Sequence, residues 1–176
     1  YDLLRSLIPQ NIISRKYAGG LSGYLGYDAM QYFEPSLSLK ASDDFDTFRF
    51  GLYKDGLILD KMTGEVTYFY YDNSRYEFLQ TLIDADDTPP GPLHIKALGD
   101  TMSQDEHAAA VAKVKQDIID GKVFQCEVGF KKRFQIQGDT LALYDQLRTI
   151  NPSPQMYYVK FGEQKLIGAS PELLFR

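Results

Sequence analysis

Residues 151–158 (Asn-Pro-Ser-Pro-Gln-Met-Tyr-Tyr) combine features that suit the binding of a small molecule. A helix that stops at Asn151 leaves several backbone carbonyls without partners in the helix. That end also carries the negative pole of the helix dipole, which favours an ammonium group. Met156 and Tyr157 add a polarizable and an aromatic surface. The pattern therefore suits a ligand with one amine and one large apolar ring, although two prolines after a helix are more commonly a simple stop.

No set of side chains in the sequence indicates catalysis, and G-x-S-x-G does not occur. The two histidines, His94 and His107, lack the spacing of metal ligands. We expect His107 to be a solvated residue in the first turn of a helix. Cys126 alternates with apolar residues, which favours a buried structural thiol over a nucleophile. Glu127 falls on the opposite side of the same predicted strand and is expected to be a solvated or hydrogen-bonded carboxylate.

Composition excludes several classes of partner. The net charge is −5 and the basic residues are scattered, which argues against nucleic acid. One cysteine cannot form an internal disulfide. No apolar run approaches the ~20 residues of a membrane span, and no basic-then-apolar leader opens the sequence. These features predict a cytoplasmic protein without a nucleic-acid or membrane partner.

The elements that would position these residues are of mixed type. Apolar spacing predicts helices over 1–7 and 74–83, with Pro9 closing the first. It predicts two more from Ser103 to Gly121 and from Asp139 to Pro152. Ser103 and Glu106 form a capping box, Gly121 suits the position after a helix end, and Asp139 is an N-cap.

Strand patterns are mixed with these helices without regular βαβ alternation. A meander is expected over 48–71, with tight turns at Asp55-Gly56 and Thr63-Gly64. A strand runs from Val123 to 136, and a hairpin over 156–169 turns at Gly162-Glu163. The glycine-rich stretch 18–28 is interpreted as a tightly packed central strand rather than a ligand loop. The fold class is α+β, with mixed, mostly antiparallel sheets and packed helices.

The clearest linker is the proline-rich stretch 85–92. It divides residues 1–84 from a linker over 85–100 and a second region over 101–176. The first residues, Tyr1-Asp-Leu-Leu, read like the middle of a helix, and the last ones end within an apolar run. Both ends look cut, so we expect a fragment of a larger protein.

Three motifs in order carry a resemblance to a known family. They are Gly19–Asp28 followed by Phe-Glu-Pro35, then Gly121–Gln125, and then Leu147–Pro154 with Gly168–Glu172. Together they resemble the chorismate-utilising enzymes, and within them the anthranilate synthase component I family. The Asn-Pro-Ser-Pro-x-Met element favours the anthranilate branch. The resemblance covers nearly the whole chain, with the linker least distinctive.

The resemblance implies an enzyme of tryptophan biosynthesis. Members of the family are lyases that convert chorismate and ammonia, or glutamine through a glutamine amidotransferase partner (component II), to anthranilate and pyruvate with Mg²⁺. Tryptophan inhibits them by feedback, binding away from the active site. Carried over by motif, the inhibitor-binding positions are Asn151, Pro152, Pro154, Met156, Tyr157 and Gly168.

The resemblance also implies what this chain lacks. Residues 1–84 would be part of the amino-terminal region of component I, and 101–176 the start of the chorismate-binding domain. The chorismate and Mg²⁺ residues of the family lie beyond Arg176. No catalytic or metal-binding residue is therefore assigned, no Mg²⁺ is expected on this chain, and the isolated chain is predicted to be inactive.

Two departures from the family pattern bear on inhibition. The family usually has an aromatic residue where Gln155 stands, and its serine-bearing inhibitor motif near the amino terminus is missing.

Two alternatives stay open. The parent protein could be aminodeoxychorismate synthase component I or another chorismate-utilising enzyme, since these share most of the motifs. The chain could instead be a non-catalytic, tryptophan-binding regulatory piece. In either case the apolar runs at both ends predict self-association through exposed core surface.

Overall fold

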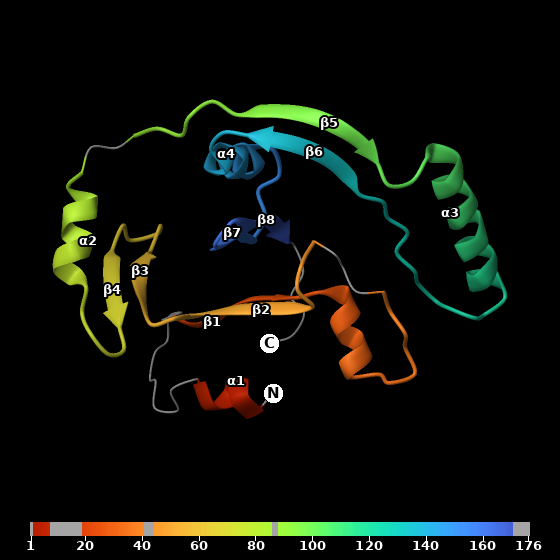
Figure 1. Ribbon diagram of the computed structural model, residues 1–176, viewed down its shortest axis with the longest axis horizontal. Coiled ribbons are helices and arrows are strands. Elements are labelled where there is room, and N and C mark those ends of the chain that lie inside the picture. Colours follow the sequence, from red (N-terminus) through yellow and green to blue (C-terminus); the bar gives the residue numbers. More distant parts are fainter. Residues whose placement is uncertain (1, 8–18, 41–43, 86–87, 171–176) are drawn as a thin grey trace. The chain divides into compact units, whose positions relative to one another are not determined.

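The computed structural model describes residues 2–7, 19–40, 44–85 and 88–170 (Figure 1). The chain divides into two compact units. The first unit is Tyr1–Asp87 with Val159–Gln164, and the second unit is Thr88–Tyr158 with Lys165–Arg176. Helices and antiparallel strands are mixed in both, which confirms the α+β prediction.

The helices are α1 (Asp2–Leu7), η1 (Tyr27–Tyr32, a 3₁₀-helix), α2 (Tyr76–Ile83), α3 (Gln104–Ile119) and α4 (Thr140–Ile150). The strands are β1 (Gly20–Leu25), β2 (Phe48–Tyr53), β3 (Asp55–Leu59), β4 (Val66–Tyr70), β5 (His94–Asp100), β6 (Lys132–Gln137), β7 (Gln155–Phe161) and β8 (Gln164–Ser170).

The glycine-rich stretch forms β1, which pairs with β2 in the first unit. A side chain at Gly23 would collide with the carbonyl of Arg49 and lie 2.7 Å from the Cα of Phe50. Glycine is therefore required there because two backbones approach closely, as predicted. The prediction of a central strand is wrong for the described residues, because β1 pairs with β2 alone in a two-stranded sheet. The unpredicted helix η1 follows and carries Asp28 and Ala29, the two buried residues among those described.

The predicted meander is half right. Thr63-Gly64 makes the expected turn between β3 and β4, with Gly64 at φ +74°. Asp55-Gly56 makes no turn, because both residues lie within β3 and Gly56 pairs with Phe69. A side chain at Gly56 would lie 2.9 Å from the Phe69 ring, so this glycine makes room for an aromatic ring. Strands β2 and β3 consequently belong to different sheets.

The β7–β8 hairpin reaches into the first unit with its tip, Val159–Gln164. The Nη1 of Arg49 donates to the Oε1 of Gln164 at 2.6 Å, and the Nε2 of Gln164 donates to the carbonyl of Asp44 at 3.0 Å. The rings of Tyr24 and Phe161 meet edge to face with centroids 6.0 Å apart. The Arg49 guanidinium also lies over the Phe161 ring at 5.9 Å. These contacts make the hairpin tip part of the first unit's packing.

Helices of the second unit begin and end where the sequence predicts. Ser103 and Glu106 form the capping box of α3, with the Glu106 N–H donating to the Ser103 hydroxyl at 3.3 Å and the Ser103 N–H donating to the Glu106 carboxylate at 2.8 Å. Gly121 follows α3 at φ +73°. The N–H of Leu141 donates to the Asp139 carboxylate at 2.9 Å and caps α4. Local capping chemistry therefore sets both helix starts.

The strand predicted from Val123 forms only in its second half, as β6. β5, for which the sequence predicted no strand, pairs with β6 so that Asp100 lies opposite Lys132. There the chain turns into α3, and the N–H of Thr101 donates to the carbonyl of Lys131 at 2.9 Å. Nothing within the described ranges continues β5 alongside residues 123–130, so that half of the prediction is wrong. A strand needs a neighbour for its ladder.

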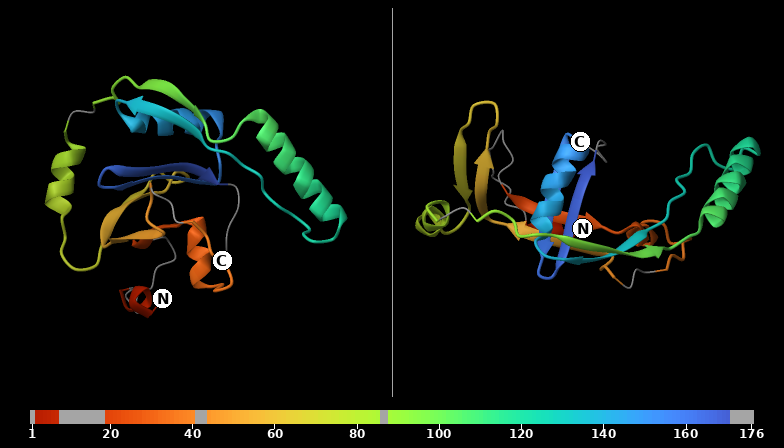
Figure 2. Two further views of the ribbon diagram at one scale, coloured as in Figure 1. Left: turned by 45° about the vertical axis from the view of Figure 1, so that its right-hand side comes forward. Right: turned by 90° about the horizontal axis from the view of Figure 1, so that it is seen from above.

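Two side-chain predictions in this region are also corrected. Cys126 is exposed rather than buried, because its segment has no sheet to pack in. His107 is half-buried rather than solvated: its Nε2 lies 3.3 Å from the carbonyl of Val128, and its ring meets that of Phe130 edge to face at 5.6 Å. The returning chain thus contacts α3 at His107, and Figure 2 shows it running from the far end of α3 back to β6.

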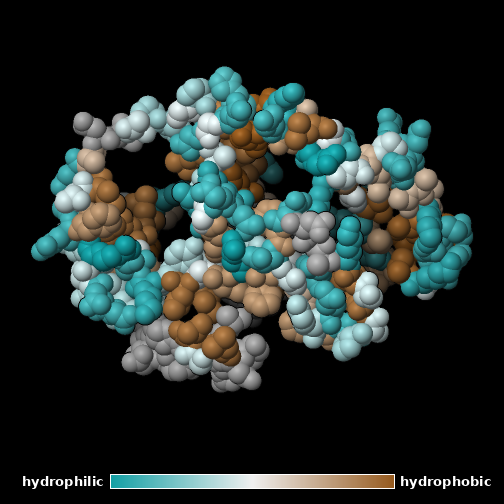
Figure 3. All heavy atoms as spheres, viewed as in Figure 1, coloured by the Kyte–Doolittle hydropathy of each residue, from teal (hydrophilic) through white to brown (hydrophobic). Residues whose placement is uncertain are grey.

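Large apolar side chains lie open on the surface of both units (Figure 3). They include Tyr76, Phe78 and Leu82 on α2, and Ile95, Phe134 and Ile136 on the paired strands β5 and β6, all at least 40% exposed. No helix in the described part of the chain is long and apolar enough to cross a membrane. The predicted closure of α1 by Pro9 and the apolar end at 173–176 lie outside the described residues.

Candidate functional site

The end of α4 leaves carbonyl groups open, as the sequence suggests. The N–H of Asn151 donates to the carbonyl of Leu147 at 2.9 Å, the last backbone bond of the helix. Pro152 and Pro154 have no N–H to donate to the carbonyls of residues 148–150. Among the described residues, no backbone hydrogen bond reaches those three carbonyls. The helix end can therefore accept hydrogen bonds from a ligand at its negative pole.

Ser153, which was not among the residues predicted from the sequence, has a buried hydroxyl group. Its hydroxyl oxygen is buried and has no hydrogen-bond partner among the described residues. A buried hydroxyl without a partner loses free energy relative to water, so such groups are rare unless a ligand or water satisfies them. The only sequence signal was its place between two prolines that stop the chain from continuing the helix.

The β7–β8 hairpin brings two of the predicted residues together. Seven-residue strands on either side of the two-residue turn Gly162-Glu163 place Tyr157 opposite Gly168. A side chain at Gly168 would collide with the Tyr157 ring, whose Cε1 would be 2.9 Å from the added atom. Gly168 does not have a positive φ, so glycine is needed for the space that the ring fills.

Met156 and Tyr157 do not form one surface. Side chains alternate along a strand, and Tyr158, next to Tyr157, packs on α4. Its hydroxyl lies 2.9 Å from that of Thr140, and its ring meets Tyr144 edge to face at 6.0 Å. Met156 shares the Tyr158 side of β7, and Tyr157 takes the other side, where Gly168 lies.

The charge nearest the helix end is already paired. Arg148 in the last turn of α4 lies 3.6 Å from the Asp145 carboxylate and 5.9 Å over the Tyr144 ring. A cation in this turn weakens the negative pole of the helix, and its pairing with Asp145 reduces that effect. The carbonyls of α4 thus remain the groups best placed to receive an ammonium group.

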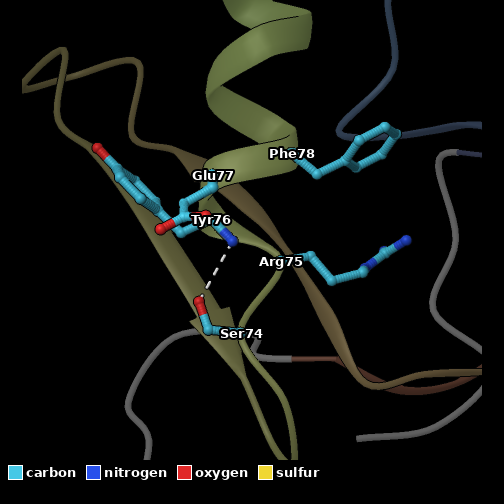
Figure 4. Close-up of a pocket in the computed structure, with 5 residues that line it drawn as sticks. All are labelled: Ser74, Arg75, Tyr76, Glu77 and Phe78. Atoms are coloured by element: carbon cyan, nitrogen blue, oxygen red, sulfur yellow. Dashed lines mark hydrogen bonds between the residues drawn. The ribbon is translucent and has the colours of Figure 1, made fainter.

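Two further pockets in the described part of the chain show no arrangement of side chains that indicates catalysis or metal binding. One, of about 620 Å³, is lined by Ser74–Phe78 at the start of α2 (Figure 4). There the side chains of Tyr76 and Phe78 point to opposite sides of the helix start, and Arg75 is held by two bonds of 2.7 and 2.6 Å to Asp55. A second, of about 200 Å³, is lined by His94–Lys96, Gln135 and Gln137. Within the described ranges no three His, Cys, Asp or Glu side chains cluster as metal ligands.

Residues 4–176 match the family of chorismate binding enzymes. The chain belongs to this family. It is 41% identical to anthranilate synthase component 1 of Leptospira biflexa over 100% of this chain and 39% of that protein. It is 34% identical to anthranilate synthase component 1 of Methanothermobacter thermautotrophicus over 100% of this chain and 37% of that protein.

A solved structure shows the same fold. The crystal structure of anthranilate synthase component I from Streptococcus pneumoniae TIGR4 aligns with a TM-score of 0.76 at 23% identity, covering 97% of this chain and 43% of that one. The resemblance predicted from the sequence motifs is confirmed. The chain spans about two fifths of the length of these relatives.

Proposed function

We propose that this chain is part of an anthranilate synthase component I that converts chorismate and ammonia, or glutamine through an amidotransferase subunit, to anthranilate and pyruvate. The observation that supports this most is the 41% identity with anthranilate synthase component 1 over the full 176 residues. The enzyme would be a lyase of tryptophan biosynthesis acting in the cytoplasm.

In this proposal the chain contributes to the binding of the inhibitor tryptophan, and the reaction takes place elsewhere in the whole protein. The described residues offer no cluster of metal ligands and so do not fit a Mg²⁺ site. The isolated chain is therefore expected to be inactive. Its contribution would be one wall of a tryptophan site, formed by Asn151, Pro152, Pro154, Met156, Tyr157 and Gly168.

The geometry around α4 and β7 is compatible with this ligand. The open carbonyls of residues 148–150 offer acceptors for its ammonium group. The Tyr157 ring, 45% exposed, offers a face for an indole ring. Ser153 adds an unsatisfied hydroxyl within the same loop, which a carboxylate or indole N–H could satisfy. Met156, on the other side of β7, would act by holding the strand against α4.

Product identity tests the reaction. The full-length protein containing this chain is supplied with chorismate, ammonia and Mg²⁺, and its product is identified by chromatography and fluorescence. Anthranilate with pyruvate is expected. Formation of 4-amino-4-deoxychorismate would instead assign the protein to aminodeoxychorismate synthase component I. The 176-residue chain, assayed in parallel, is expected to give neither product.

Ligand fluorescence tests the sensing role. The chain contains no tryptophan and 13 tyrosines, so excitation at the red edge of indole absorption reports the added ligand alone. A saturable change in emission or anisotropy on titration is expected. Phenylalanine has the amine and an aromatic ring but no indole, so it serves as the control ligand. An excess of phenylalanine should compete with tryptophan only if the site does not require the indole ring. Absence of any saturable change, in both this chain and the full-length protein, would remove tryptophan from the proposal.

A further inference from the structure

Two hydroxyl groups join the start of α4 to the middle of β7. The hydroxyl oxygen of Tyr158 lies 2.9 Å from that of Thr140, the first residue of the helix, and the contact is partly buried. The ring of Tyr158 also meets the ring of Tyr144, one turn further along α4, edge to face with centroids 6.0 Å apart. A hydrogen bond that is shielded from water is stronger than one on an open surface, so this pair is a firm contact between helix and strand.

The contact closes a loop that contains the candidate site. Thr140 and Tyr158 are 18 positions apart, and between them lie the rest of α4, the turn at residues 151–154 and the first half of β7. The chain reverses in the turn, so Tyr158 returns to the helix start while the turn stays at the helix end. Helix and strand are therefore held together at two places, covalently through the turn and by the hydroxyl pair at the opposite end.

The turn itself offers few hydrogen bonds that could hold the strand in place. Pro152 and Pro154 have no N–H to donate, and the Ser153 hydroxyl has no partner among the described residues. The setting of β7 against α4 consequently depends on side chains further along the strand, and the pair of Tyr158 with Thr140 supplies a polar contact there.

The same contact decides which way Tyr157 faces. Neighbouring side chains of a strand point to opposite faces. Holding Tyr158 against α4 therefore turns Tyr157 away from the helix, to the side where Gly168 leaves room for its ring. A strand that slips or rotates against the helix moves this ring relative to the carbonyls of residues 148–150. The spacing between those carbonyls and the ring thus depends on a contact that includes neither of them.

We propose that Tyr158 and Thr140 are positioning residues of the tryptophan site, neither of which touches the ligand. Their hydroxyl pair sets the spacing between the carbonyls at the end of α4, which accept the ammonium group, and the Tyr157 ring, which faces the indole ring. The inference rests on the tryptophan-binding role proposed above. A site that is held in its binding geometry before the ligand arrives pays less to become ordered on binding. A ligand that uses both ends of the site should therefore depend on the hydroxyl pair, and a ligand that uses one end should not.

Calorimetric titration of the full-length protein that contains this chain tests the proposal. Tyr158→Phe and Thr140→Val each remove one hydroxyl and should each weaken tryptophan binding about fivefold, the factor that one hydrogen bond contributes. The double variant should bind no more weakly than the weaker single variant, because both substitutions break the same bond. Thr140→Ser keeps a hydroxyl and should bind like the wild type. Unchanged tryptophan affinity in Tyr158→Phe would overturn the inference.

Two comparisons separate positioning from a general loss of stability. Indole-3-propionate is tryptophan without its amine, so Tyr158→Phe should change its affinity less than about twofold. Ser103→Ala removes the cap of α3 in the same unit and should leave tryptophan affinity unchanged although it lowers stability. Equal weakening of both ligands by Tyr158→Phe, or an equal loss of tryptophan affinity in Ser103→Ala, would show a merely structural role and refute the inference. A wild-type protein that binds no tryptophan would refute the tryptophan site itself, and this inference with it.

Discussion

The close contact between Tyr157 and Gly168 is the residue-scale feature on which the proposed tryptophan site depends most directly. The Tyr157 ring lies across the hairpin against Gly168 and fills the space that a side chain at position 168 would need. Sequence motifs identified both positions through family resemblance, but they gave no reason for the glycine. The reason is steric and appears only when the two strands are paired.

Gly168→Ala is expected to displace the Tyr157 ring. Overpacking of this kind costs ~1–3 kcal/mol, and a displaced ring should lower tryptophan affinity roughly tenfold for each ~1.4 kcal/mol of lost contact. Thermal unfolding and ligand titration measure the two effects. Gly129→Ala is the matched control, because a side chain there meets nothing within 4 Å. Wild-type affinity in Gly168→Ala would place the ligand away from Tyr157.

Ser153→Ala should separate binding from stability. The hydroxyl is buried without a partner, so its removal is expected to raise the free energy of unfolding of the free chain, by up to ~1 kcal/mol. Tryptophan affinity should fall in the same variant, because the ligand would lose the group it satisfies. Urea unfolding and fluorescence titration give the two numbers. A loss of stability would show that the hydroxyl already has a partner in solution.

The Asp55–Arg75 pair predicts a dependence of stability on pH. Hydrogen bonds from Arg75 and then Tyr68 hold the pKa of the Asp55 carboxyl below its ordinary value of 3.8. The folded state therefore binds this proton less tightly than the unfolded state. The stabilisation is fully present above pH 3.8 and is lost as the pH falls through the lower pKa of the folded protein.

Asp55→Asn should accordingly lower the free energy of unfolding at neutral pH, and its effect should shrink as the pH falls through the lowered pKa of Asp55 in the folded protein. Urea unfolding across this range is the measurement. Asp72→Asn is the control, since Asp72 and its partner Lys54 are both more than half exposed and such pairs contribute little. A constant difference between Asp55→Asn and wild type at every pH would contradict the prediction.

At the scale of elements, features that depend on neighbouring residues were predictable and those that depend on distant ones were not. The caps at Ser103 and Asp139 and the turn at Gly64 follow from local chemistry and are as predicted. Asp55-Gly56 has the signature of a tight turn, but pairing with β4 draws both residues into a strand. In the candidate site, the order of helix, prolines and hairpin was predictable, whereas the unsatisfied Ser153 hydroxyl was not. The spacing of residues in the sequence does not indicate whether a single atom, such as the Ser153 hydroxyl oxygen, is buried.

The capping box of α3 allows a quantitative test at this scale. Ser103→Ala removes the acceptor for the Glu106 N–H and should destabilise α3 by ~0.5–2 kcal/mol. Hydrogen exchange along residues 104–119 should accelerate accordingly. Gln104→Ala, one residue further on and without a capping bond, serves as control. Unchanged exchange in Ser103→Ala would show that packing of the returning chain, rather than the cap, holds the helix start.

For the whole molecule, the exposed apolar surface predicts association of the isolated chain. Apolar side chains remain open on α2 and on the paired strands β5 and β6, and large patches of this kind favour contact between copies. Sedimentation velocity should show a weight-average mass that rises with concentration. Phe134→Asp, on the apolar face of β5–β6, should reduce this rise, and Gln135→Asp, on the opposite face, should not. An ideal monomer at every concentration would contradict the prediction.

The hairpin tip that belongs to the first unit has a consequence for dissecting the molecule. Because Val159–Gln164 lies in the first unit while the flanking residues lie in the second, the polypeptide passes between the units three times. A protease cut between Asp87 and Thr88 would therefore leave the first unit divided between two pieces, which would be held together by side-chain contacts such as those of Gln164 with Arg49 and Asp44 and of Phe161 with Tyr24. Residues 1–87 are thus not a transplantable module, and any boundary for exchanging parts between relatives has to carry the hairpin tip along with them.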